Sequence, residues 1–107
     1  MSTLICTIEL NKQENQGITI KVDGKGNNVV KHAIQLTKDS ITMTSNKGEN
    51  ATVITQKADS INLDVLDVDK KASVIHMNKD EITIGCKEFS LKASGTITIK
   101  GKMVYLG

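Results

Sequence analysis

The sequence predicts an all-β fold, and we expect an elongated triple-stranded β-helix (β-prism) formed by three intertwined chains. The 107 residues include 13 Ile, 8 Val and 11 Thr, and such β-branched side chains favour strands. Apolar and polar residues alternate with period two along most of the chain, and no segment of about ten residues has the period of an amphipathic helix. A short motif recurs at a spacing of about 20 residues, which is typical of solenoids and β-helical rods.

The recurring motif is a triplet of an apolar residue, Thr or Asn, and a second apolar residue. Because successive side chains of a strand point to opposite faces, the two apolar residues share one face and the polar residue lies on the other. The copies are Ile18-Thr19-Ile20, Ile41-Thr42-Met43, Ile61-Asn62-Leu63, Ile82-Thr83-Ile84 and Ile97-Thr98-Ile99.

Three copies extend into a longer repeat unit that aligns without gaps. The units are residues 33–44, 53–64 and 74–85. In each unit an Ile lies seven residues before the triplet and an Asp lies two before it. Asp closes local turns with its own side chain, so each unit predicts a strand, a short capped corner and a second strand. The acids expected to cap the corners are Asp39, Asp59 and Asp80.

The remaining segments are less regular. A looser fourth unit runs over residues 89–100, with Gly95 in place of the Asp. Residues 24–28 and 45–50 are rich in Gly and Asn, which predicts longer turns. Alternation breaks within residues 64–69, which indicates a bulge or a turn.

Two architectures satisfy this repeat. A single chain could wind into a β-solenoid, or three identical chains could share a narrow aliphatic column around one axis. We favour the shared axis, because only Phe89 and Tyr105 are aromatic and large rings normally fill the core of a small domain. Sharing also explains how so short a chain could be stable. The residues expected to line the axis are Ile41, Met43, Ile61, Leu63, Ile82, Ile84, Ile97 and Ile99.

Composition excludes several other roles. The net charge is only +2 and Arg is absent, so we expect no nucleic-acid partner. The N-terminal residues lack the basic and apolar regions of a signal peptide, and no stretch approaches the ~18 apolar residues of a membrane span, so we expect the protein to start in the cytoplasm. Cys6 and Cys86 lie in no Cys/His cluster, and we expect reduced thiols.

No constellation predicts catalysis, a metal site or a cofactor. An enzyme needs converging groups such as a nucleophile with a base, and the sequence places none together, so we expect no enzymatic activity. His32 and His76 are isolated in the sequence. The three corner acids lack the Gly-rich pattern of calcium-binding β-helices, so we expect no calcium. A small ligand-binding β-sandwich or barrel is a further alternative, and the scarcity of aromatic residues argues against its pocket.

The series of triplets along the chain resembles the repeat of a known protein family. Ile-Thr-Ile triplets separated by Asp-Ser, Asp-Glu and Ser-Gly corners, ending in Ala93-Ser-Gly-Thr-Ile-Thr-Ile-Lys-Gly-Lys-Met-Val-Tyr-Leu-Gly107, resemble the C-terminal needle of VgrG spike proteins of type VI secretion. The central spikes of contractile phage tails look similar. The resemblance is one of repeat style. It implies a needle over residues 28–107, with N-terminal strands over residues 1–27 that form a base or dock onto a hub.

The resemblance implies a homotrimeric, membrane-puncturing spike of a type VI secretion or related contractile injection system. Its partners would be its own copies, a tube or hub protein at the N-terminal end, a PAAR-like tip protein at the C-terminal end and, transiently, a target membrane. The protein would be cytoplasmic before firing and then secreted by the machine without a signal peptide. The residues expected to receive the tip protein are Met103, Val104, Tyr105, Leu106 and Gly107.

The sequence departs from this family in several respects, and its repeat is less regular than the strict octads of phage needles. Spike proteins of the family carry large hub and OB-fold domains, so this chain would be a minimal needle or would rely on another subunit for the hub. Some phage spikes hold an iron ion through His-x-His pairs, which this sequence lacks, so we expect no such metal. The alternative function is a single-chain β-solenoid that acts as a self-assembling or adhesive structural protein.

Overall fold

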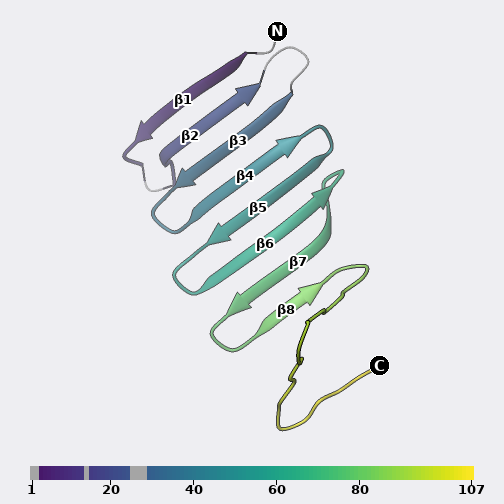
Figure 1. Cartoon of the computed structure of the whole chain (residues 1–107). Helices are drawn as coiled ribbons and strands as arrows, with labels where there is room; N and C mark the ends of the chain where they lie inside the picture. The colour runs from purple at the N-terminus through teal and green to yellow at the C-terminus, as the bar shows by residue number, and fades with distance from the viewer. Residues whose placement is uncertain (1–2, 14, 25–28) are drawn as a thin grey trace.

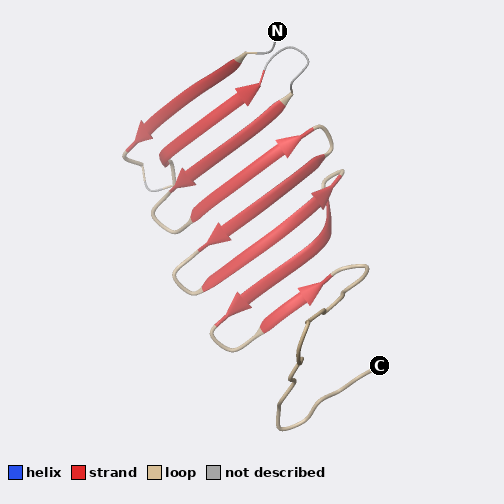
Figure 2. Ribbon diagram, viewed as in Figure 1, coloured by secondary structure: helices blue, strands red, loops and turns tan. Residues whose placement is uncertain are grey.

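The computed structural model describes residues 3–13, 15–24 and 29–107, which form one sheet of eight antiparallel strands in sequence order (Figures 1 and 2). Each strand pairs with the next one along the chain, and the sheet does not close on itself. The all-β prediction is confirmed. Among these residues no helix is long and apolar enough to span a membrane. The strands are β1 (Leu4–Asn11), β2 (Gly17–Gly24), β3 (Val30–Leu36), β4 (Ile41–Lys47), β5 (Asn50–Gln56), β6 (Ser60–Asp67), β7 (Lys70–Asn78) and β8 (Ile82–Gly85).

The three repeat units fold as predicted, each as a strand, a corner and a strand. Their corners join β3 to β4, β5 to β6 and β7 to β8, and all lie at the same end of the strands (Figure 1). In each corner the backbone N–H of the first residue donates to the carbonyl oxygen of the fourth at 2.9 to 3.0 Å, from Thr37 to Ser40, from Lys57 to Ser60 and from Asn78 to Glu81.

The side chain that caps a corner is not the predicted Asp. Oδ1 of Asn78 accepts the N–H groups of Asp80 and Glu81, both at 2.9 Å. Oγ1 of Thr37 accepts the N–H of Ser40 at 3.3 Å. In these two corners the first residue is the cap, because its side-chain oxygen faces the free N–H groups. The third corner begins with Lys57, which has no side-chain oxygen. The capping predicted for the three corner acids is therefore wrong. In the part of the chain that the structure describes, no hydrogen bond reaches the carboxylates of Asp39, Asp59 or Asp80.

The opposite end of the sheet uses tighter corners. The longer turn predicted at residues 45–50 is wrong, because β4 runs to Lys47 and β5 starts at Asn50, which leaves only two loop residues. Gly48 permits this with a φ of 62°. The irregularity predicted within residues 64–69 is confirmed, since the β6–β7 register shifts between Val65 and Leu66. Apart from Gly24, the turn predicted at residues 24–28 lies outside the described residues.

Residues 86–107 form an extended C-terminal arm without any strand, although the structure describes all of them. A bend at Ser94 and Gly95 stands where the fourth repeat unit predicts a corner. The strands predicted on either side of it are absent, because a strand needs a hydrogen-bonded neighbour and the chain offers none beyond β8. In Figure 1 the arm runs away from β8 and past the end of the sheet.

The sheet has no second layer. None of the described residues is buried, and the Cα radius of gyration is 18.2 Å, whereas a compact chain of this length has about 13 Å. Hydrogen bonds join the strands, and the described residues form no hydrophobic core inside the chain.

Gly17 and Gly48 provide a test of this backbone. Both have positive φ, but a Cβ on Gly17 would collide with the carbonyl oxygen of Leu36, whereas a Cβ on Gly48 meets open space. We expect Gly17→Ala to lower the free energy of unfolding by about 2–5 kcal/mol and Gly48→Ala by about 1 kcal/mol. Urea unfolding followed by circular dichroism, at one protein concentration, measures both. Equal losses would contradict the close approach of β2 to β3.

Candidate functional site

The strand register arranges the side chains of one face, here called the apolar face, into columns that cross the sheet. Residues directly opposite each other in paired strands share a face. The central column consists entirely of aliphatic side chains. Its members are Ile8, Ile20, Ile34, Met43, Ile54, Leu63, Ile75 and Ile84.

Two further columns flank the central one. The corner column lies two residues away, towards the repeat corners, and is aliphatic except for one Gln. It contains Leu10, Ile18, Leu36, Ile41, Gln56, Ile61, Met77 and Ile82. The far column lies two residues away in the other direction and has smaller or more polar side chains. It contains Cys6, Val22, His32, Ser45, Thr52, Val65 and Ser73.

The chain leaves this face uncovered. Even in the middle of the sheet, Ile34 and Ile54 are each 37% exposed. The whole chain exposes 9240 Å², whereas a compact monomer of its mass exposes about 5,800 Å². The difference is about 3,400 Å² per chain, spread over both faces of the sheet and the arm, and it exceeds the ~800 Å² that each partner contributes to a standard interface. The apolar face is the aliphatic part of this uncovered surface.

Six of the residues predicted to line an axis lie on the apolar face. Met43, Leu63 and Ile84 are in the central column, and Ile41, Ile61 and Ile82 are in the corner column. Ile97 and Ile99 lie instead in the arm, where they are 49% and 63% exposed.

Other members of the columns were missed by the triplet motif. Ile34, Ile54 and Ile75 come seven residues before a triplet and lie in the central column beside it. Their regular spacing in the repeat units was the signal that could have identified them. Ile8 and Leu10 of β1 belong to no repeat unit, and only the register assigns them to these columns.

The residues predicted to receive a tip protein lie at the end of the arm. Tyr105 and Leu106 are 83% and 90% exposed. The Tyr105 hydroxyl is 3.5 Å from Sδ of Met103. The C-terminus lies off the sheet in Figure 1, and these side chains are exposed.

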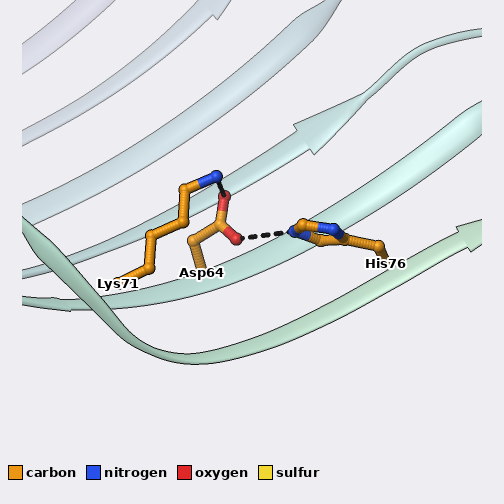
Figure 3. Close-up of polar contacts among 3 residues, drawn as sticks. All are labelled: Asp64, Lys71 and His76. Carbon is orange, nitrogen blue, oxygen red and sulfur yellow. Dashed lines mark hydrogen bonds and ion pairs between the residues drawn. The ribbon is translucent and has the colours of Figure 1, made fainter. Parts of the chain in front are cut away.

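The opposite, polar face carries a cluster of Asp64, Lys71 and His76 (Figure 3). The Asp64 side chain is 11% exposed; its Oδ1 lies 3.0 Å from Nε2 of His76 and its Oδ2 lies 3.9 Å from Nζ of Lys71. Because a carboxylate only accepts, Nε2 of His76 carries the donated hydrogen. The cluster joins β6 to β7 and stabilises this strand pair.

Neither histidine is isolated in the structure. Nδ1 of His32 is 2.7 Å from Oγ of its cross-strand neighbour Ser45. His76 pairs with Asp64, 12 residues earlier. Sequence reasoning missed both contacts because the strand register was not known. The register was the only signal that could have predicted them.

The described residues form no group of three or more His, Cys, Asp or Glu side chains that could hold a metal ion. The corners that carry Asp39, Asp59 and Asp80 are two strands apart, a distance of about 9–10 Å. Carboxylates that share a calcium ion lie much closer together, since each oxygen is about 2.3–2.6 Å from the ion. Cys6 and Cys86 are free and exposed.

Comparisons with protein-family models, with curated proteins and with solved structures find no match for this chain.

The polar cluster makes a testable contribution to stability. We expect Asp64→Ala to lower the free energy of unfolding by about 1–2 kcal/mol, because His76 loses its acceptor. Asp64→Asn keeps an acceptor oxygen and should lose less. Urea unfolding compares these variants with Asp59→Ala, whose carboxylate has no partner among the described residues and whose effect should stay within about 0.5 kcal/mol. An Asp64→Ala protein as stable as Asp59→Ala would contradict a structural role for the cluster.

Proposed function

We propose that the chain is a structural needle, a homotrimeric β-prism whose three copies turn their apolar faces towards a common axis. The observation that carries this proposal is the central column, an unbroken line of aliphatic side chains across the sheet, none of which the chain itself buries. In a trimer the cover of each apolar face is supplied by the other two copies.

The shape of the apolar face favours a narrow shared column. Residues two apart along a strand are about 7 Å apart, so the central and corner columns make a strip only two side chains wide. The strip contains no aromatic residue, which suits an axis where three backbones approach closely. The exposed excess of about 3,400 Å² per chain is enough for a permanent assembly.

The arm supports the intertwined part of the architecture. Its apolar residues pair with no strand among residues 3–13, 15–24 and 29–107. Three arms that wind around one another below β8 would satisfy both their backbone groups and the side chains of Ile97 and Ile99. The rod would then end in Met103, Tyr105 and Leu106, where a PAAR-like tip protein would sit.

Membrane puncture is the role that we propose for this rod, as the spike of a type VI secretion or related contractile injection system. The VgrG-like repeat style of the sequence supports this assignment. The strands β2 to β7, each paired on both sides, would keep their backbone groups satisfied in contact with lipid, so a stiff rod could transmit axial force without catalysis.

The assembly is tested by mass. We expect light scattering after size exclusion to give three times the 11.6 kDa of one chain. Ile54→Lys would place three charges near the axis and abolish the trimer, whereas Thr55→Lys, one residue along on the polar face, would preserve it. A monomeric parent protein, or a trimeric Ile54→Lys variant, would overturn the shared axis. Polymers of growing length would support the self-assembling alternative.

The spike role is tested by location. In cells that produce the protein, we expect immunogold labelling to mark one end of isolated contractile particles. A Met103→Asp/Leu106→Asp variant should still reach the particles but should no longer retain a tip protein, as measured by mass spectrometry of the purified particles. Label that is absent from the particles, or spread along them, would contradict the proposal.

A further inference from the structure

We infer that Gln56 of one copy hydrogen-bonds to Thr52 of the next copy, and that this polar pair fixes the register of the copies along the axis. The inference rests on the proposed trimer. It concerns a residue that breaks an otherwise aliphatic column, and it assigns that residue a partner.

Gln56 stands where the repeat otherwise has a large apolar residue. In the aligned units its position is occupied by Leu36 and Met77, and its neighbours in the corner column are Ile41 and Ile61. Within the described part of the chain, its side-chain amide makes no hydrogen bond. Burying that amide without a partner would cost free energy, so an assembly that covers the apolar face must supply one.

Thr52 is the polar residue that a three-fold axis would bring to Gln56. Thr52, Ile54 and Gln56 are the residues of β5 in the far, central and corner columns, and Asn50 lies on the same face beyond the far column. In the proposed trimer the three-fold axis runs across the strands, in the direction in which they are stacked. The three β5 strands then lie at the same height along the axis, and Ile54 of each copy points towards it. The corner end of one copy then meets the far end of the next, as in any heterologous ring. The Thr52 hydroxyl also has no partner within the described residues.

The other strands support the same contact between the corner column of one copy and the far column of the next. In each strand a long side chain of the corner column would face a different, mostly shorter side chain from the same strand of the next copy, which is how facing layers fill space. The facing pairs are Ile18 with Val22, Leu36 with His32, Ile41 with Ser45, Ile61 with Val65 and Met77 with Ser73. Of the levels from β2 to β7, only that of β5 has hydrogen-bonding side chains on both sides.

The pair would also discriminate against a slipped assembly. Because neighbouring strands are antiparallel, the smallest slip that restores strand direction is two strands. Such a slip would place Thr52 against Leu36 or Met77 and leave its hydroxyl unpaired. A single polar pair in an apolar interface fixes register in this way in coiled coils.

Disulfide cross-linking tests the pair. In a Cys6→Ser/Cys86→Ser background, a Thr52→Cys/Gln56→Cys chain cannot close on itself, because the two residues are about 13 Å apart along one strand and a disulfide reaches about 7 Å between Cα atoms. We expect oxidation to give a covalent trimer on a non-reducing gel. The matched control is Ser73→Cys/Gln56→Cys, which moves the far-column cysteine from β5 to β7, two strands away. It should not cross-link.

The outcomes separate the inference from the proposed function. A parent protein with the mass of three chains, combined with no cross-link or with equal cross-linking of the control, would overturn the pair and leave the trimer standing. A parent protein with the mass of one chain would overturn both. A covalent species that stops at two chains would overturn the three-fold ring.

A second measurement covers the case in which the cysteine variants do not assemble. Gln56→Leu, Thr52→Val and their combination form a double-mutant cycle on the thermal midpoint of the trimer. If the pair forms, each single variant leaves one polar group unpaired, and the combined shift differs from the sum of the single shifts. Additive shifts would overturn the pair.

Discussion

One constraint governs this molecule: a single sheet with an apolar face has no layer of its own to cover that face. Stable domains bury such a face against a second layer. Here all eight strands belong to a single sheet. The backbone groups between strands are satisfied, but hydrogen bonds contribute little net free energy compared with apolar burial. In the proposed trimer the hydrophobic contribution comes from the other copies. Folding and assembly would then be one equilibrium, and stability would depend on protein concentration.

The sequence predicted what depends on local pattern. Alternation identified the strands of the repeat units, and the broken alternation at Val65 and Leu66 located the irregularity that the register confirms. Corner positions were correct, although the capping oxygens belong to Thr37 and Asn78, because a capping residue is selected by geometry that composition does not reveal.

Features that depend on which strands pair with each other could not be predicted from the local pattern. Ile97 and Ile99 have the same triplet as Ile82 and Ile84, yet only the latter pair lies in a strand. The difference is the presence of β7 beside β8 and the absence of a further strand beside the arm. The contact of Asp64 with His76 depends on the same kind of information, because it joins neighbouring strands rather than neighbouring residues.

Strain is concentrated at the corner between β6 and β7. Val68 and Asp69 have φ values of 50° and 63°, which suit the twist of a two-residue hairpin but are unfavourable for a β-branched residue. Left-handed backbone costs about 1–2 kcal/mol for a residue with a Cβ. The N–H of Val68 donates to the carbonyl oxygen of Glu49 at 2.9 Å. This bond joins two successive corners and offsets part of the cost.

The repeat length follows from the meander itself. Two strands of seven to nine residues with their corners account for a unit of about 20 residues. Each unit adds two strands, or about 9–10 Å, in the direction in which the strands are stacked. The columns of the apolar face grow by the same step, since each contact involves only adjacent strands. A molecule built in this way is a linear array. Its length can change by whole units without altering the packing of any other level, which is the property that a rod of defined length requires.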